Sequence, residues 1–256
     1  MLAELRAAVL DWYTGSRRDL PWRRTTDPYA ILVSEVMLQQ TQVARVVPRY
    51  LAWLERWPSA ASLAVASRAE VLAAWVGLGY NRRAVALHEA ARVVARDGWP
   101  ADLTTLPGVG PYTAAAVASF AFGAQVAAVD TNVQRVASRL GHGSPQALLA
   151  PGRAAEWNQA AMELGATVCT ARAPRCDACP VTEWCSCGPA AERPAVARRA
   201  ERFEDSNRWV RGRIVAALAA GEGLPDVAPD RLERALAGLV RDGLIRPADG
   251  GFTLDG

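Results

Sequence analysis

Four cysteines stand close together in the segment CTARAPRCDACPVTEWC. Cys169, Cys176, Cys179 and Cys185 are separated by six, two and five residues, and Cys187 lies just beyond them. Four thiols this close predict that either disulfides or a metal centre holds the loop, and the cytosolic address expected below favours a metal centre. Because no histidine stands within the segment, the choice lies between a zinc ion held by four thiolates and a 4Fe-4S cluster. We expect Cys187 to lie outside the ligand set.

Two carboxylates stand in surroundings that permit acid-base chemistry. Glu35 interrupts the apolar run YAILVSEVML, so it lies either on an exposed helix face or buried with a raised pKa, and a buried carboxyl group is a candidate general acid. Asp130 follows an apolar stretch and precedes TNVQRVASRL, which predicts a position at a helix start. An aspartate there is often an N-cap, so capping and chemistry both remain open for Asp130.

The stretch LPGVGPYTAAAVASFAFG predicts a tight turn followed by a helix. Gly108, Val109 and Gly110 would direct backbone N–H groups toward the start of the helix that begins near Tyr112. Pro111 suits the first helical turn, where its missing N–H costs nothing. Free amides at a helix N-terminus form an anion site, so the turn could hold a phosphate of DNA without reading its sequence.

The composition is that of a folded protein of ordinary polarity. The chain has 256 residues, of which 51% are hydrophobic and 21% charged, and its net charge is +3. All 29 basic residues are arginine. No run of eighteen apolar residues occurs and the N-terminus does not have the pattern of a signal peptide, so we expect a cytoplasmic protein without disulfides.

Helical periodicity dominates the sequence and predicts an all-α fold with a small α+β appendage. The expected helices are 2–13, 29–39, 41–54, 67–76, 82–97, 112–122, 131–140, 153–166, 208–220 and 230–242. LIRPADGGFTL then predicts a hairpin around Asp249 and Gly250, and helix, helix, hairpin is the order of a winged-helix unit. The residues 191–205 have linker composition.

Several stretches resemble one family in the same order along the chain. They are SEVMLQQTQV, WVGLGYNRRAVALHEAA, LPGVGPYTAAAVASFAFG, VDTNVQRV and the four-cysteine segment. Together they resemble the helix-hairpin-helix DNA glycosylases, most closely the MutY-type adenine glycosylases. The resemblance implies a 4Fe-4S cluster on the four cysteines. It also implies an iron-sulfur domain of residues 1–20 and 129–190 and a six-helix domain of 21–128. The composition predicts a linker of 191–205, and the order helix, helix, hairpin predicts an appendage of 206–256.

The resemblance assigns roles to particular residues. In such enzymes an adenine is flipped out of the duplex. Glu35 corresponds to the general acid that protonates the purine, Asp130 to the carboxylate that stabilises the positive sugar, and Tyr112 to the tyrosine beside it. The remaining matches are Arg23, Trp22 and Asn132 in the substrate pocket, Gln40 and Tyr80 near the lesion in the base stack, and Gly108, Val109 and Gly110 on the DNA backbone. Arg82, Arg83 and Arg135 are further candidate phosphate contacts.

Three features of the sequence refine these expectations. Endonuclease III relatives carry a lysine where this chain has Tyr112, and because the chain has no lysine we expect a monofunctional glycosylase. The usual Asp-Gly-Asn is Asp130-Thr131-Asn132 here, and Asn81 replaces a second tyrosine after Tyr80. Residues 201–256 are too few for the Nudix-like domain of longer MutY enzymes, which leaves the stringency for 8-oxoguanine open.

The expected partner is double-stranded DNA with adenine opposite 8-oxoguanine or guanine. A monomer in a bacterial-type cytoplasm, associated with the nucleoid and not with a membrane, is the expected state. Two alternatives stay open. A thymine or uracil mismatch glycosylase of the same superfamily shares the hairpin, the tyrosine and the aspartate. A noncatalytic iron-sulfur protein that binds DNA would not need the carboxylates at all.

Overall fold

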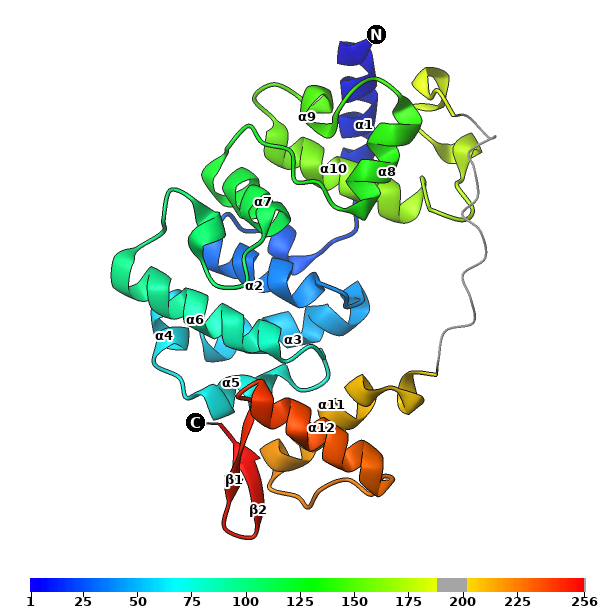
Figure 1. The fold of residues 1–256 in the computed structure, drawn as a ribbon. Helices are drawn as coiled ribbons and strands as arrows, with labels where there is room; N and C mark the ends of the chain where they lie inside the picture. The colour runs from blue at the N-terminus through cyan, green and yellow to red at the C-terminus, as the bar shows by residue number, and fades with distance from the viewer. Residues whose placement is uncertain (188–201, 256) are drawn as a thin grey trace. The chain divides into compact units, whose positions relative to one another are not determined.

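The computed structural model describes residues 1–187 and 202–255, and these form helices with one small hairpin (Figure 1). Most of the predicted linker, residues 191–201, lies outside the described residues. The chain divides into two compact units. Unit 1 comprises Met1–Leu32 and Val109–Val196, and unit 2 comprises Val33–Gly108 and Ala197–Gly256. The domain limits proposed above remain predictions, and the two units are described separately.

Unit 1 is built from helices that are distant in the sequence. They are α1 (Leu2–Ser16), the first part of α2 (Pro28–Leu38), α7 (Pro111–Phe122), α8 (Thr131–Leu140), α9 (Pro145–Leu148) and α10 (Ala154–Thr167). Helix α10 packs against α1, α7 and α8. Apolar side chains of α1, α8, α9 and α10 form a shared core that includes Leu5, Val9, Val136, Trp157 and Leu164. This core holds the start of α8, where Asp130 lies.

Unit 2 has four helices from the middle of the chain. They are α3 (Val43–Arg56), α4 (Ala60–Ala64), α5 (Arg68–Trp75) and α6 (Arg82–Asp97). Ser59 and Ser67 begin α4 and α5 with capping boxes, in which each serine side chain accepts a backbone N–H while the side chain three residues later accepts in return. Trp53 packs edge-on against Trp57 and Trp75, with ring centroids 4.7 and 5.6 Å apart. These rings join α3 to α5 in the core.

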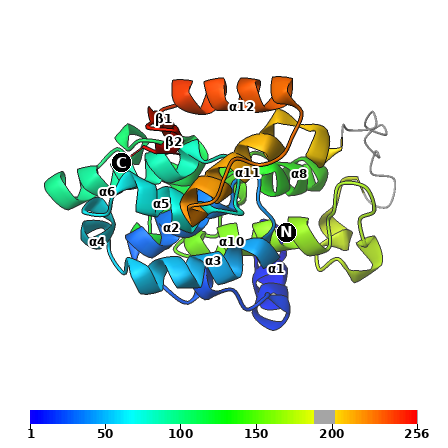
Figure 2. The same cartoon turned by 90° about the horizontal axis from the view of Figure 1, so that it is seen from below.

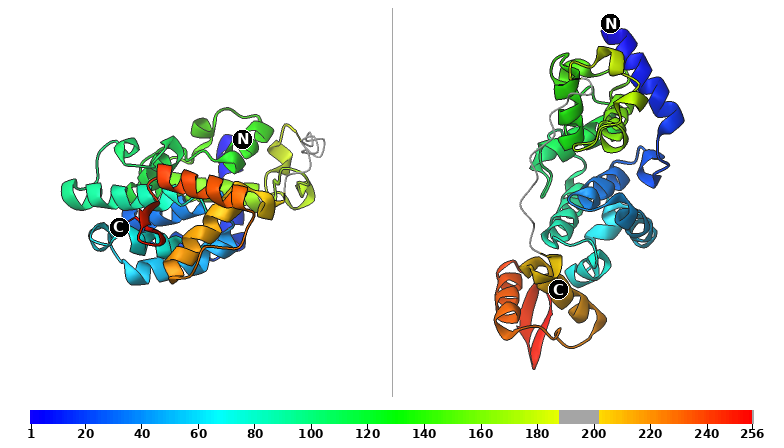
Figure 3. Two further views of the ribbon diagram at one scale, coloured as in Figure 1. Left: turned by 60° about the horizontal axis from the view of Figure 1, so that its bottom comes forward. Right: turned by 90° about the vertical axis from the view of Figure 1, so that its right-hand side faces the viewer.

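The C-terminal appendage belongs to unit 2. It consists of α11 (Asn207–Ala220), α12 (Pro229–Arg241) and the hairpin of β1 (Ile245–Ala248) and β2 (Gly251–Leu254), which pair antiparallel (Figures 2 and 3). Helix α11 packs against both α5 and α12. Arg68 of α5 donates to the Gly243 carbonyl at 3.3 Å and to the Asp255 carboxylate at 3.0 Å. These contacts join the appendage to the rest of the unit.

The helical fold predicted from periodicity is confirmed, and the ten expected helices begin and end within three residues of those observed. The hairpin around Asp249 and Gly250 is also present. The short helices α4 and α9 were not predicted, because four or five residues are too few to show a period. No helix of the described residues is long and apolar enough to cross a membrane.

Candidate active site and cysteine loop

Asp130 lies at the N-cap of α8, and hydrogen bonds fix its carboxylate. Oδ1 accepts the backbone N–H of Val133 at 2.7 Å, which is the capping bond. Oδ2 accepts from the side-chain amide of Asn132 at 2.8 Å. Both carboxylate oxygens are thus held within one turn of the chain. The capping interpretation is correct, and it leaves a half-buried, oriented carboxylate at the start of the helix.

Asn132 is held in turn by Arg135, which reaches the cysteine loop. The Asn132 Oδ1 atom accepts from Arg135 Nη2 at 2.7 Å, and the same guanidinium donates to the carbonyls of Gly165 at 2.7 Å and Cys169 at 2.8 Å. Arg135 therefore forms internal bonds, and its contact with a phosphate remains a prediction. A continuous set of hydrogen bonds runs from Asp130 to the backbone of the first cysteine.

Helices α8 and α10 approach each other closely at Gly165. A Cβ atom at this position would lie 2.6 Å from the Asn132 Cβ and 3.1 Å from its Cα and carbonyl oxygen. Real Cβ atoms essentially never lie as close as 2.6 Å to another heavy atom, and the two contacts at 3.1 Å are also tight, so glycine is favoured here for packing. The contact adds a steric restraint to the hydrogen bonds that position Asn132.

Arg23 forms part of a buried ion cluster that sequence reasoning missed. Glu163 of α10 is fully buried, and its carboxylate accepts from Arg18 at 2.7 and 2.8 Å and from Arg23 at 2.7 Å. Burial by itself would raise the pKa of Glu163, but the hydrogen bonds from both arginines and the Arg23 charge outweigh burial and lower the pKa to about 2. Glu163 stands among small and apolar residues in AAMELGA, which was the available signal.

Tyr112 and Trp22 both belong to unit 1. The Tyr112 Oη atom lies 4.0 Å from the Met162 sulfur of α10, one position before Glu163. Trp22 is buried in a short 3-10 turn, Pro21–Arg23, next to Arg23. Tyr112 and Arg23 therefore both contact the same part of α10. Their roles at a substrate remain predictions.

The segment that leads to Asp130 is held by a second residue that sequence reasoning missed. Asn158 of α10 is buried; its Oδ1 accepts the Ala128 N–H at 3.1 Å and its Nδ2 donates to the Val126 carbonyl and the Ser119 hydroxyl, both at 2.9 Å. These bonds satisfy the extended chain between α7 and α8, which has no regular secondary structure. They fix the backbone two residues before Asp130.

Glu35 lies in α2 and belongs to unit 2. It is 6% exposed, with Val36 and Met37 also buried, which decides between the two positions that the sequence left open. A buried carboxyl group is a candidate general acid. The convergence of Glu35 with Asp130 on one nucleotide stays a prediction.

Arg83 organises the end of α2 through hydrogen bonds to backbone carbonyls, and its contact with a phosphate remains a prediction. Its Nη1 donates to the carbonyls of Val36 at 2.8 Å and Gln39 at 2.5 Å, and its Nη2 donates to those of Leu78 at 3.0 Å and Gly79 at 2.9 Å. Burial lowers the pKa of Arg83 to about 10. The guanidinium thus ties the turn after α2 to the turn before α6.

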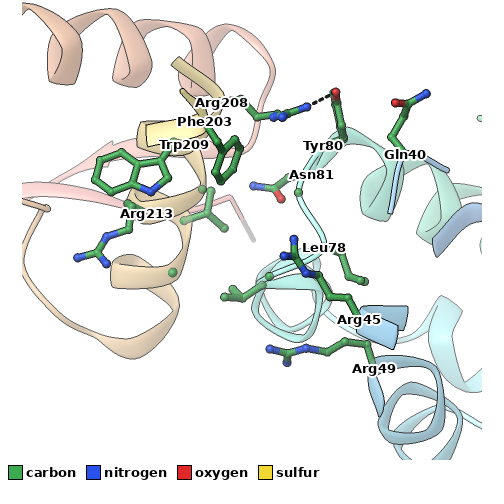
Figure 4. A pocket seen from close by; sticks show the side chains of 16 residues that line it. Gln40, Arg45, Arg49, Leu78, Tyr80, Asn81, Phe203, Arg208, Trp209 and Arg213 are labelled. Atoms are coloured by element: carbon green, nitrogen blue, oxygen red, sulfur yellow. Dashed lines mark hydrogen bonds between the residues drawn. The ribbon is translucent and has the colours of Figure 1, made fainter. Parts of the chain in front are cut away.

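Gln40 and Tyr80, the two predicted base-stack residues, follow these turns. Each has a positive φ, 57° for Gln40 and 48° for Tyr80, and they are the non-glycine residues with this conformation in the described part of the chain. Such strain persists where the surrounding structure imposes it, often at functional sites. Both residues line one cleft of about 510 Å³, here named the Tyr80 cleft (Figure 4).

Each residue of the turn 108–110 is suited to its position for a different structural reason. Gly108 has φ +74°, and a Cβ there would lie 2.6 Å from the Ala86 Cβ of α6. Val109 is buried. Gly110 is the N-cap of α7 with Pro111 following, and a Cβ at Gly110 would meet nothing within 4 Å. Gly108 is needed for packing and conformation, whereas Gly110 leaves open space beside the first amides of α7. Phosphate binding by the turn remains a prediction.

The cysteine loop encloses the predicted cluster site. Arg139, Val168 and Pro174 contribute to one cavity, which is also lined by the four sulfur ligands, Cys169, Cys176, Cys179 and Cys185. The four thiols surround this cavity, and cysteine thiolates hold either a zinc ion or an iron-sulfur cluster.

The charge balance of the loop also fits a bound cationic centre. The pKa of Cys176 is raised, first by burial and then by the neighbouring thiols of Cys185 and Cys169. The ionised form of closely spaced thiols is thus disfavoured, so four thiolates need a positive charge beside them. Arg139 Nη1 donates to the Cys169 sulfur at 3.4 Å and to the Thr170 carbonyl at 2.8 Å. Hydrogen bonds of this kind orient and tune ligands of a metal centre. Cys187 is exposed and does not line the cavity.

Comparisons with known proteins agree with this arrangement. Residues 33–151 match the family described as HhH-GPD superfamily base excision DNA repair protein, and residues 169–185 match the iron-sulfur binding domain of endonuclease III. The loop is thus an iron-sulfur domain, and the zinc alternative is set aside.

Solved structures share the fold. A thermostable thymine-DNA glycosylase has a TM-score of 0.67 and 32% identity, with 72% of this chain and 95% of that chain covered. An endonuclease III-DNA covalent intermediate has a TM-score of 0.60 at 24% identity, with 73% and 96% covered. The second likeness concerns the fold alone.

Curated relatives extend over the whole chain. An adenine DNA glycosylase of Mycolicibacterium smegmatis is 48% identical, covering 97% of this chain and 95% of the relative. One of Mycobacterium tuberculosis H37Rv is 46% identical, covering 97% and 92%. The human adenine DNA glycosylase is 45% identical over 70% of this chain and 38% of its own length. The chain belongs to the adenine DNA glycosylase family of the HhH-GPD superfamily of base excision DNA repair proteins.

Proposed function

We propose that this protein removes adenine paired with 8-oxoguanine or guanine in double-stranded DNA and leaves an abasic strand uncut. The single observation that carries the proposal is the different treatment of its two carboxylates. Glu35 is 6% exposed in an apolar helix, whereas Asp130 has both oxygens held by N–H donors at 2.7 and 2.8 Å. A buried carboxyl group and an oriented carboxylate are the two groups that glycosidic bond cleavage uses.

Each residue then has a defined task on an extruded adenine. Glu35 donates a proton to the purine ring, so that adenine leaves as a neutral base. Asp130 faces the sugar as the N-glycosidic bond breaks and positive charge develops there, and Asn132 holds the Asp130 carboxylate through the 2.8 Å bond. A water molecule then adds to the sugar carbon and loses a proton to solvent, which leaves the abasic site. A positioned acid contributes about 10²- to 10⁴-fold in rate. Tyr112 and Arg23 border the pocket, with Glu163 fixing the Arg23 guanidinium at 2.7 Å.

The four cysteines would hold a 4Fe-4S cluster, whose part here is structural. When bound, the cluster cross-links the loop of residues 169–185. Arg135 and Arg139 join that loop to α8, through the Cys169 carbonyl at 2.8 Å and the Thr170 carbonyl at 2.8 Å. The integrity of the loop therefore bears on the position of Asn132 and Asp130. No chemical step is assigned to the cluster.

The chain has no lysine, so no side-chain amine is available to attack the sugar and form a Schiff base. We therefore propose a monofunctional enzyme. We also propose that it acts as a monomer in a bacterial-type cytoplasm, at the nucleoid. Borohydride treatment during turnover should trap no covalent enzyme-DNA adduct. Trapping in high yield would contradict the monofunctional assignment.

A comparison of mispairs tests the substrate. The protein is incubated with labelled duplexes that contain 8-oxoguanine·A, G·A, G·T or G·U, and base release is followed under single-turnover conditions. We expect release of adenine from the first two duplexes and intact strands on G·T and G·U. Glu35→Gln is the matched inactive control, since it keeps the shape of the side chain and removes its proton-donating ability.

A thymine or uracil mismatch glycosylase is the second candidate. The structural similarity to a thermostable thymine-DNA glycosylase, at a TM-score of 0.67 and 32% identity, favours it. The adenine DNA glycosylases of two mycobacteria favour the first candidate, because they are 46–48% identical over 97% of the chain. Dominant release of thymine or uracil in the same experiment would select the second candidate. A noncatalytic iron-sulfur protein would leave all four duplexes unchanged.

A further inference from the structure

The Tyr80 cleft has a wall that the proposed catalytic function does not explain. One side comes from α3 and the turn Val76–Asn81, and the other from Phe203 and α11 of the C-terminal appendage (Figure 4). Both sides belong to unit 2. The appendage is held there by Arg68, and Arg211 of α11 pairs with Asp242 at 2.5 Å. With about 510 Å³, the cleft has the volume of a site for a ligand of nucleotide size.

The cleft is strongly basic. Arg45 and Arg49 come from α3, and Arg208 and Arg213 come from α11, while no aspartate or glutamate lines it. Within residues 1–187 and 202–255, none of these four guanidinium groups has a carboxylate oxygen within 4.0 Å. Among the described residues, their positive charge is therefore not balanced by a neighbouring carboxylate.

The arrangement on α3 carries a cost that a bound anion would relieve. Arg45 and Arg49 stand four residues apart, so they lie on the same face of the helix and repel each other. Figure 4 shows both side chains extending from α3 toward α11. Gly77 makes room for this, because a Cβ there would lie 3.2 Å from the Arg49 Nη2 atom. Two guanidinium groups converge on one space.

Exposed aromatic rings border the same space. Tyr80 and Phe203 are 44% and 48% exposed, and the Arg208 guanidinium lies 4.9 Å from each ring centroid. Arg208 also donates a hydrogen bond to the Tyr80 hydroxyl. The Arg213 guanidinium lies 5.6 Å from the Trp209 ring. Interleaved arginines and aromatic rings form the type of surface that binds a nucleic-acid strand, since phosphates pair with the arginines and bases stack on the rings.

We propose that the Tyr80 cleft is a binding site for a DNA strand at the flank of the mispair, and that α11 of the appendage contributes half of it. Arg45, Arg49, Arg208 and Arg213 hold phosphates, and Trp209 supports a base or sugar by stacking. The inference rests on the proposed function, because it assumes that DNA is the substrate. It assigns the appendage a role in DNA affinity.

The test compares Arg213→Ala, Arg45→Ala and the double variant with Arg246→Ala. Arg246 is an exposed arginine on β1 of the same appendage and does not line the cleft. Its replacement changes the net charge by the same amount as each single cleft variant. Binding to a fluorescein-labelled duplex with an 8-oxoguanine·A pair, and to its undamaged counterpart, is measured by anisotropy between about 50 and 200 mM salt. Thermal unfolding confirms that each variant is folded.

We expect each single cleft variant to weaken binding about five-fold. The slope of log K against log salt should fall by about 0.9 for each phosphate contact that is lost. Trp209→Ala should weaken binding by at least as much, and Trp209→Phe should restore most of it because a ring is kept. Arg246→Ala should retain the affinity and slope of the unchanged protein.

The inference is overturned if the cleft variants bind both duplexes with the affinity and salt slope of Arg246→Ala. It is also overturned if they lose binding to a polyglutamate peptide but keep binding to DNA, because the occupant would then be an acidic protein segment. Adenine release by the unchanged protein distinguishes a failure of the proposed function from a failure of the cleft proposal. No release would refute the proposed function while the binding comparison still decides the cleft.

Discussion

A single methyl group added at Gly165 tests how rigidly the Asp130 carboxylate must be held. In Gly165→Ala the new Cβ would lie 2.6 Å from the Asn132 Cβ, whereas carbon atoms pack best at about 3.5–4.0 Å. Because the Cα and carbonyl oxygen of Asn132 are also within 3.1 Å, no side-chain rotation removes the overlap. Helices α8 and α10 must separate by about 1 Å at this point.

The free energy of this change can be worked out against a matched control. Overpacking of this kind costs about 1–3 kcal/mol, while replacing a helical glycine by alanine stabilises a helix by up to about 1 kcal/mol. Gly15 of α1 is also helical, in the same unit, with no atom within 4 Å of an added Cβ. Gly15→Ala should therefore show only the helical gain. We expect Gly165→Ala to be less stable than Gly15→Ala by about 1–3 kcal/mol.

In Gly165→Ala the rate of adenine release should fall by more than the loss of folded protein would explain. Moving Asn132 by about 1 Å shifts the donor that orients Asp130, and displacements of this size can cost about 10²-fold in rate. Single-turnover release from the 8-oxoguanine·A duplex, measured well below the unfolding temperature, gives the rate. Urea unfolding gives the stability. If Gly165→Ala equals Gly15→Ala in both measurements, the close approach at Gly165 does not position the site.

Three further changes test the other parts of the site. Glu163 has a folded pKa of about 2 against an ordinary value of 4.5, so its stabilisation is present above about pH 4.5 and is lost as the pH falls toward 2. That loss is worth about 3 kcal/mol, and Glu163→Gln should lack this pH dependence in urea titrations. Glu35→Gln should lower single-turnover adenine release by about 10²- to 10⁴-fold and leave duplex affinity unchanged, and an unaltered rate would remove Glu35 from the mechanism. Cys176→Ser should abolish iron binding, measured as iron per chain, whereas Cys187→Ser should retain it; equal loss in both would redefine the ligand set.

Local sequence patterns were sufficient to predict the helices and the residue types that could carry the chemistry. Apolar residues at helical spacing predicted α6 at Arg82–Asp97 as observed, because a helix that packs on one face must repeat its buried side chains at that period. The cysteine spacing and the position of Asp130 before α8 were likewise readable, since ligand spacing and capping depend on neighbouring residues. These features are local, and local interactions decide them.

Only the tertiary structure decided what surrounds each group. In the sequence, Glu163 resembles any other acidic residue of a helix. In the structure, Arg18 and Arg23, about 140 residues away, donate hydrogen bonds to its carboxylate. The bonds of Arg83 and Arg135 to backbone carbonyls of distant segments could not be read from the sequence. Burial and ion pairing are set by which distant segments pack together, and that packing follows from the whole core, which no local pattern encodes.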